Sequence, residues 1–100
     1  MNSVILIGRL TRDPELHIKN TGEKIASFTI IVHRPLTRDI CDFIDCVARN
    51  EKADFVMRNF KKGSVVEVRG ITTTRTEEPN RKVTECRVDE ASFGRSVSYQ

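Results

Sequence analysis

The side chains best suited to binding chemistry in this sequence are basic ones spread over several predicted strands and hairpins. Lysine and arginine number 17 against 14 aspartates and glutamates, which gives a formal net charge of +3 and a pI of about 9.0. This excess leans towards an anionic partner, although many domains without one share it. If the strands close into a barrel, a subset would line one face and neutralise phosphates; otherwise each is ordinary solvated surface. The candidates are Lys24, Arg34, Arg49, Arg69, Arg75, Arg81 and Lys82.

One aromatic residue accompanies these cations as a candidate contact. Phe43 opens a short apolar run, and strand alternation directs it away from Ile44 and Cys46. A phenyl ring at such a position is either a platform on which bases stack or a core residue, and the pattern favours neither reading. Phe28 and Phe60 are predicted to be core residues.

Residues that could catalyse a reaction or bind a metal are not arranged for either task. His17 and His33 lie in separate predicted strands, and the sequence has no Gly-rich phosphate loop. The cysteines lack metal-ligand spacing, and an odd number of them fits reduced thiols better than a disulfide framework. They are Cys41, Cys46 and Cys86. We therefore expect no enzymatic activity, no metal and no cofactor.

Residues 43–70 predict a strand, a helix and a second strand, around which the rest of the chain is organised. Asn50 is the predicted N-cap of the helix, and Gly63 is predicted to end it. The apolar side chains recur at helical spacing and are Ala53, Val56, Met57 and Phe60. Because so short a helix is unstable alone in water, it must pack on an apolar surface. We expect a small β-barrel to supply that surface.

Strand patterns occupy most of the remaining chain. Residues 4–8 form a continuous apolar run typical of a buried strand, and Gly8 inside it indicates a bend. Residues 24–34 alternate between apolar and polar side chains. Residues 34–39 are predicted to be a connector, because Pro35 breaks a strand ladder. Further strands are predicted at residues 64–75 and 82–92, joined by a turn at 77–80, and residues 15–19 could form a short strand.

The order of elements reads β-β-β-α-β-β. It predicts an all-β OB-fold, a five-stranded barrel with one short helix between strands three and four. An α+β sheet with one packed helix would give the same order, so that alternative stays open. A chain of 100 residues makes one domain. We place this domain at residues 1–95, followed by a short polar C-terminal end at 96–100.

Nothing in the sequence directs the chain to a membrane. No apolar run approaches the roughly 20 residues that a spanning helix requires. The N-terminus lacks the basic and apolar regions of a secretory signal. Together with the thiols, these features predict a cytoplasmic protein.

Three stretches resemble the bacterial single-stranded DNA-binding proteins, an OB-fold family that coats unpaired DNA in replication, recombination and repair. Residues 3–16 are similar to that family's opening strand, residues 26–35 to a following strand, and residues 43–70 to its strand–helix–strand stretch. The resemblance implies sequence-tolerant binding of single-stranded DNA at the nucleoid by a homodimer or homotetramer that pairs its first strands. Val4 and Leu6 would then lie at the oligomer contact, although the same run suits plain core. Replication or primosome proteins are implied as further partners.

This chain has fewer of the aromatic residues with which that family binds DNA. In the family, aromatic side chains in a basic groove stack on bases, and each stacked base contributes about 1–3 kcal/mol. Phe43 keeps one such position, whereas the others carry Leu36, Arg49 and Glu77. Losing two or three stacked bases would lower the affinity by orders of magnitude. Arg49 can compensate in part, because a guanidinium stacks on bases and pairs with phosphate. Arg34 and Arg75 lie beside positions that the family uses.

Other departures favour an alternative function. The loop at residues 35–42 is shorter than the family's hairpin, and the 100 residues do not include the Gly- and Pro-rich tail with its acidic tip. These features suit an oligomeric protein-interaction module of a primosome or replication complex with weak DNA binding, like the primosomal replication protein related to this family. Arginines retained at groove positions favour DNA binding instead. A third alternative is an inert subunit that mixes with a full-length paralogue.

Overall fold

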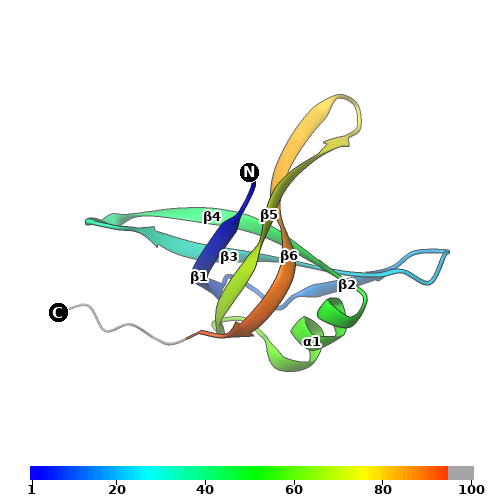
Figure 1. Cartoon of the computed structure of the whole chain (residues 1–100), viewed down its shortest axis with the longest axis horizontal. Coiled ribbons are helices and arrows are strands. Elements are labelled where there is room, and N and C mark those ends of the chain that lie inside the picture. Colours follow the sequence, from blue (N-terminus) through cyan, green and yellow to red (C-terminus); the bar gives the residue numbers. More distant parts are fainter. Residues whose placement is uncertain (95–100) are drawn as a thin grey trace.

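The computed structural model describes residues 1–94, apart from the side chain of Arg38, so the predicted polar end at 96–100 lies outside the described residues. Within residues 1–94 the chain forms six strands and one helix (Figure 1). They are β1 (Val4–Leu10), β2 (Glu15–Ile18), β3 (Lys24–Arg34), β4 (Thr37–Arg49), α1 (Glu51–Asn59), β5 (Val65–Glu77) and β6 (Arg81–Phe93).

The described strands close into a barrel of five. The sheet runs in the order β1-β5-β6-β4-β3-β2, and an additional pairing of β1 with β3 closes the ring. The short β2 lies on the same edge of β3 as β1: β1 pairs with Ile30 and Ile31, and β2 with residues 24–27. The predicted five-stranded OB barrel is therefore confirmed. The helix follows the fourth strand in chain order, not the third, because β2 is a strand of its own.

Two glycines allow the strands to bend and cross closely. A Cβ atom on Gly8 would collide with the carbonyl oxygen of Ile31, where β1 passes over β3. A Cβ atom on Gly70 would collide with the carbonyl oxygen of Arg87. The pairing of β5 with β6 changes register between Arg69 and Gly70, so the ladder is irregular at this close approach. Glycine is thus required at these two positions, because the sheet coils tightly there in order to close the barrel.

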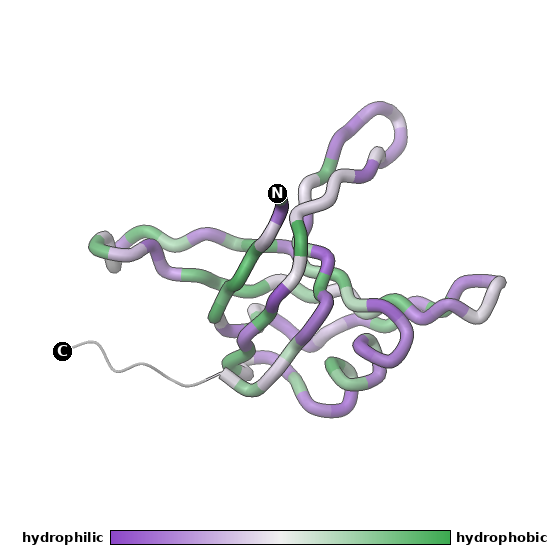
Figure 2. Tube along the Cα trace, in the orientation of Figure 1, coloured by the Kyte–Doolittle hydropathy of each residue, from purple (hydrophilic) through white to green (hydrophobic). Residues whose placement is uncertain are grey.

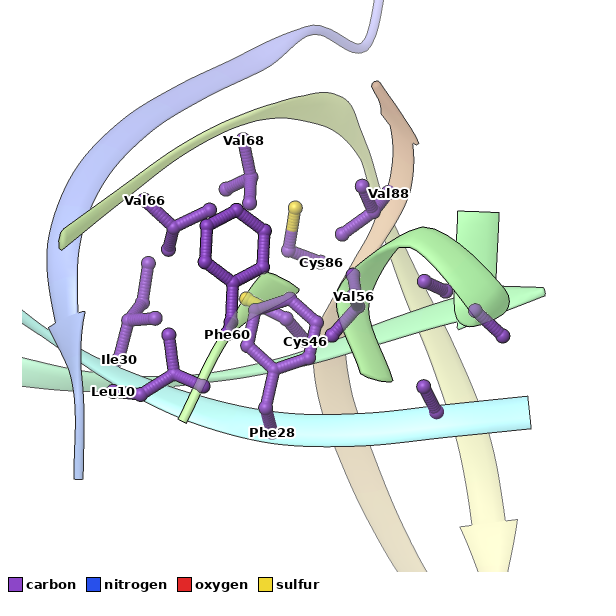
Figure 3. Packing of buried hydrophobic residues seen from close by; sticks show 13 residues of the cluster. Leu10, Phe28, Ile30, Cys46, Val56, Phe60, Val66, Val68, Cys86 and Val88 are labelled. Atoms are coloured by element: carbon purple, nitrogen blue, oxygen red, sulfur yellow. The ribbon is translucent and has the colours of Figure 1, made fainter. Parts of the chain in front are cut away.

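The barrel interior and one face of α1 form a single core (Figure 3). Phe60, just beyond the helix, is 4% exposed and contacts the rings of Phe55 and Phe93 at centroid distances of 5.8 and 5.3 Å. The helix therefore packs on the barrel as expected for an element too short to persist alone. The buried set confirms the predictions for Phe28 and Phe60; its members are Leu10, Ala26, Phe28, Ile30, Cys46, Ala48, Ala53, Val56, Phe60, Val66, Val68, Cys86 and Val88.

Both ends of the helix differ from the sequence prediction. Asn50 makes no side-chain capping hydrogen bond; its Oδ1 instead accepts from the backbone N–H of Lys24 at 3.2 Å. This contact ties the start of α1 to β3. The helix ends at Asn59 rather than at Gly63, because Phe60 adopts an extended conformation and points into the core.

The predicted connector at residues 34–39 is wrong. β3 and β4 form one long hairpin, and Pro35 and Leu36 make its two-residue turn. Proline interrupts no ladder there, because it occupies the turn itself. This hairpin and the β5–β6 hairpin project from the barrel as two arms (Figure 1). Figure 2 shows the β5–β6 tip as hydrophilic, whereas the β3–β4 tip carries apolar residues, among them the fully exposed Leu36.

Candidate nucleic-acid interface

Phe43 stands on the outer face of the barrel. It lies in β4 opposite Ile31 of β3, and its side chain is 65% exposed. Its neighbours Ile44 and Cys46 face inward and pack in or against the core. A large apolar ring kept this exposed on a sheet can present a face to a planar ligand. Of the two readings that the sequence left open for Phe43, the structure excludes the core.

Two of the predicted basic residues are engaged by carboxylates on neighbouring elements. Arg34 donates from Nε and Nη2 to the carboxylate of Asp42, at 2.9 and 3.0 Å, across the β3–β4 hairpin. The hydrogen bond from Arg34 lowers the pKa of Asp42. Lys24 Nζ lies 3.1 Å from Asp54 Oδ1 on α1. Exposed pairs of this kind are screened by solvent and contribute little to stability, so a phosphate group can displace either carboxylate.

The arginines of β5 are also paired. Arg75 contacts Glu77 at 2.8 Å and Glu85 at 3.2 Å, and these two hydrogen bonds raise the pKa of its guanidinium. Arg69 lies 3.8 Å from Glu67 on the same strand. Glu77 occupies a position where the resemblance implied an aromatic side chain, and it holds Arg75 instead of stacking on a base. The groove expected to be basic is thus largely neutral along β5.

Two arginines remain uncommitted beside the N-terminus of α1. Within residues 1–94, neither Arg49 nor Arg87 forms an ion pair. Arg87 lies in β6 and pairs with Val47 of β4. Val47 precedes Arg49 by two residues on the same strand. Both side chains line a hollow of about 300 Å³, whose wall consists of Glu23, Arg49, Asn50, Glu51, Lys52, Arg87, Val88 and Asp89. Arg49 and Arg87 therefore lie together at one end of β4, in a hollow that they share with Glu23, Glu51 and Asp89.

The sequence analysis did not include Arg87 among the candidate DNA contacts, although strand alternation indicates that its side chain is on the outer face. Cys86 and Val88 both face the core, so strand alternation places Arg87 on the outer face. What the pattern cannot supply is the parallel pairing of β4 with β6, which brings Arg87 beside Arg49. The remaining predicted cations, Arg81 and Lys82, begin β6 and lie opposite Glu77 and Thr76 at the tip of the β5–β6 hairpin. The structure does not bring these two together with Arg49.

A second hollow opens beside Phe43 and is mainly apolar. It has a volume of about 350 Å³ and is bounded by β1, β4, β5 and β6. In Figure 1 these segments converge between the N-terminus and the bases of the two hairpin arms. We call it the barrel-mouth pocket; it is lined by Val4, Leu6, Phe43, Ile44, Asp45, Thr72, Thr84, Glu85 and Cys86.

The predicted oligomer residues face this pocket and the core rather than the outside. Val4 and Leu6 pack against the core from β1. Ile5 and Ile7, their neighbours on the same strand, point outward and are exposed. Any surface contact through the face of β1 would therefore involve Ile5 and Ile7 directly.

Two features of residues 1–94 concern metal binding and membrane insertion. Residues 1–94 contain no group of three or more histidine, cysteine, aspartate or glutamate side chains placed to hold a metal ion. Their one helix, α1, has nine residues and is too short and too polar to cross a membrane.

Comparison with known proteins identifies relatives. The single-stranded DNA-binding protein of Halalkalibacterium halodurans is 42% identical over 84 residues, covering 80% of this chain and 50% of that protein. Single-stranded DNA-binding protein A of Bacillus subtilis is 42% identical over 82 residues, covering 78% and 48%. The single-stranded DNA-binding protein of Fusobacterium nucleatum is 37% identical over 103 aligned positions, covering 94% and 67%. The chain spans about half the length of the first two.

The fold and the family follow from two further matches. The crystal structure of the single-stranded DNA-binding protein from Thermus aquaticus superposes with a TM-score of 0.81 over 100% of this chain and 43% of that one. At 24% identity this match establishes the shared fold. The model of the Single-strand binding protein family matches residues 1–94. With an exposed aromatic residue and free arginines on the outer face of an OB barrel, the chain belongs to the Single-strand binding protein family.

Proposed function

We propose that this protein binds single-stranded DNA, largely without regard to sequence, in replication, recombination or repair. The observation that carries the proposal is Phe43, held on the outer face of the barrel with 65% of its side chain exposed. A stacked base buries that ring, and stacking tolerates any base because each has a π-face. The names of the relatives support the same ligand class.

The phosphate backbone would be held chiefly by Arg49 and Arg87. Neither side chain has an internal ion pair to break within residues 1–94, so each can bind phosphate without losing a contact. Arg34 and Arg75 would have to exchange a carboxylate for a phosphate, which reduces their net contribution. Binding of this kind releases counterions and weakens as salt rises. We expect fewer phosphate contacts, and so a shallower salt dependence, than the predicted set of cations implies.

We further propose that the protein acts as a homodimer or homotetramer in the cytoplasm, at the nucleoid, without enzymatic activity. The exposed Ile5 and Ile7 on β1 support self-association, because adjacent exposed apolar side chains on one strand mark an interaction surface. Val4 and Leu6 would then contribute to self-association indirectly, because their packing holds β1 against the core. Replication or primosome proteins are further proposed partners.

A second candidate function is the protein-interaction module. Leu36 favours it: this apolar side chain is fully exposed at the tip of the β3–β4 hairpin, where the backbone has φ of 68°. The pairing of four predicted DNA-contacting cations with carboxylates also lowers the charge free for DNA. Weak DNA binding combined with a protein partner would fit these two observations.

Fluorescence anisotropy with labelled oligo-dT of about 35 nucleotides, enough for two or more barrels at roughly 4–16 nucleotides each, tests the proposal. Phe43→Ala is expected to weaken binding about 5- to 150-fold, the equivalent of one stacked base. The matched control is Phe93→Ala, because Phe93 is also 65% exposed but lies at the end of β6. Arg49→Ala and Arg87→Ala should each weaken binding and reduce its salt dependence, whereas Arg58→Ala on the exposed side of α1 should not.

Two results would contradict this function. One is millimolar or weaker binding by the wild-type protein at low salt, which would leave the protein-interaction module as the better account. The other is equal loss in Phe43→Ala and Phe93→Ala, which would mean that the outer face of β4 is not the binding surface.

A further inference from the structure

Two of the three cysteines meet inside the barrel. Cys46 of β4 and Cys86 of β6 are direct partners in the short parallel pairing of these strands. Both are free thiols, 1% and 3% exposed, and both side chains belong to the core shown in Figure 3. Neighbouring strands lie about 4.7–4.9 Å apart, and a disulfide joins Cα atoms about 4.4–6.8 Å apart. The strand pairing therefore places these two thiols at a separation that a disulfide can bridge.

Cys86 also forms part of the wall of the barrel-mouth pocket, whereas Cys46 lies behind it. A buried thiol is ordinarily unreactive. This pocket has a volume of about 350 Å³, and hydrogen peroxide is little larger than a water molecule, which occupies about 30 Å³ in the liquid. A small peroxide can thus reach Cys86 in the folded protein, while a bulkier thiol reagent cannot approach a sulfur atom that is so little exposed.

The two thiols differ in acidity in the direction that an oxidation requires. A hydrogen bond from Cys46 lowers the pKa of Cys86. The same hydrogen bond, together with burial, raises the pKa of Cys46. The sulfur atom on the pocket wall is therefore the more readily deprotonated one, and the thiolate is the form that attacks a peroxide. Cys46 keeps its proton and stands beside the sulfur atom that would be oxidised first.

We propose that Cys46 and Cys86 form a redox-modification site, at which hydrogen peroxide produces an intrachain disulfide that links β4 to β6. The Cys86 thiolate attacks one peroxide oxygen, so that an S–O bond forms, the O–O bond breaks, and the departing hydroxide takes a proton to become water. Cys46 then attacks the sulfur atom of the sulfenic acid. The S–S bond forms, the S–O bond breaks, and the hydroxide leaves as water with the proton of Cys46. Two thiols are oxidised, and one peroxide is reduced to two waters.

The disulfide would join the barrel where its strands are paired over the shortest length. In the described chain, β4 and β6 pair only at Cys46 with Cys86 and at Val47 with Arg87, whereas β5 and β6 pair along most of their length. A cross-link between residues 46 and 86 closes a long loop, which restricts the unfolded chain. The oxidised protein should therefore melt about 10–30 °C above the reduced protein.

The test uses the Cys41→Ser variant, in which Cys46 and Cys86 are the only cysteines. The folded protein is treated with hydrogen peroxide, then with catalase, and is unfolded in iodoacetamide before its mass is measured. Reduced protein should gain one label on each thiol, whereas oxidised protein should gain none and should have lost two hydrogen atoms. Digestion with trypsin should release residues 39–49 joined to residues 83–87, and dithiothreitol should separate them. Thermal unfolding of both forms gives the shift in Tm.

Cys86→Ala is the matched control, because it also keeps two thiols. Cys41 and Cys46 are separated by five positions along β4, so they point to opposite faces and lie about 16 Å apart. The same peroxide treatment should give this variant no intrachain disulfide. Far-UV circular dichroism shows whether it is folded, and the result for Cys41→Ser stands without it.

The outcomes decide the proposal without any measurement of DNA binding. Labelling of both thiols after peroxide treatment would overturn it, as would oxidation of Cys86 to a sulfinic acid without a cross-link. A disulfide between two copies of the chain, visible by non-reducing electrophoresis, would also overturn it. An intrachain disulfide that lowers Tm would contradict the position of Cys46 and Cys86 as strand partners, because their linkage would then distort the barrel.

Discussion

Replacing Phe60 by alanine should separate the stability of the barrel from its binding surface. Phe60 is 4% exposed and joins α1 to the core through ring contacts with Phe55 and Phe93 at 5.8 and 5.3 Å. Removing a buried phenylalanine side chain costs about 3–5 kcal/mol, which includes the cavity that it leaves. Small domains unfold with about 5–15 kcal/mol, so this change removes a large part of the total.

The magnitude translates into a measurable shift in melting temperature. At roughly 4–8 °C per kcal/mol for a domain of this size, Phe60→Ala should lower Tm by about 12–40 °C. Far-UV circular dichroism during urea and thermal unfolding is the assay, because the chain has no tryptophan. Phe43→Ala is the control: the same substitution at an exposed site should change the free energy of unfolding by about 0.5 kcal/mol or less.

Phe60→Ala and Phe43→Ala should have opposite effects on stability and on affinity for oligo-dT. Phe60→Ala, measured at a temperature where it remains folded, should keep the affinity of the wild-type protein for oligo-dT, whereas Phe43→Ala should lose affinity and keep stability. A cost below about 1 kcal/mol for Phe60→Ala would refute the reasoning that α1 fills the barrel through this side chain. Equal destabilisation by Phe43→Ala would show that Phe43 is not exposed in solution.

Three further results are expected. Gly70→Ala should destabilise the barrel by about 1–3 kcal/mol in urea unfolding, because the added methyl group meets the carbonyl oxygen of Arg87; an unchanged midpoint would mean that the close approach is absent. A thiol reagent should label Cys41 rapidly and the two buried thiols only after denaturation, as mass spectrometry would show. The Arg34–Asp42 hydrogen bond lowers the pKa of Asp42, so its stabilising effect is present above the ordinary carboxyl pKa and is lost as pH falls through the lowered value. Arg34→Gln should move the NMR titration midpoint of Asp42 upward, and a midpoint that does not move would contradict the pair.

The barrel and its helix could be predicted because they depend on local patterns. Alternation in residues 24–34 and the helical spacing of Ala53 and Val56 are properties of consecutive residues. The errors occurred where tertiary contacts override local preference. Pro35 was predicted to break a strand, yet it sits in the turn of a long hairpin. Asn50 was predicted to cap the helix, yet its side chain accepts a hydrogen bond from β3.

The candidate site also combines features that local sequence patterns predict with features that depend on tertiary contacts, and the second kind dominates there. The sequence singles out Phe43 as the remaining aromatic position, and strand alternation separates it from Ile44. Alternation does not reveal which cations are free, because an ion pair joins residues that are distant in the chain, as in Lys24 with Asp54. Whether a predicted arginine can bind phosphate therefore depends on its neighbours in space.

By itself, the sequence determined the family, the fold class and the surface character of most positions, because these follow from residue type and short-range periodicity. Only the tertiary structure decided three matters: that β4 and β6 lie parallel and place Arg87 beside Arg49, that carboxylates neutralise most of the other predicted cations, and that a pocket opens beside Phe43. Each of these results from closing the sheet, which brings together side chains that no local pattern relates.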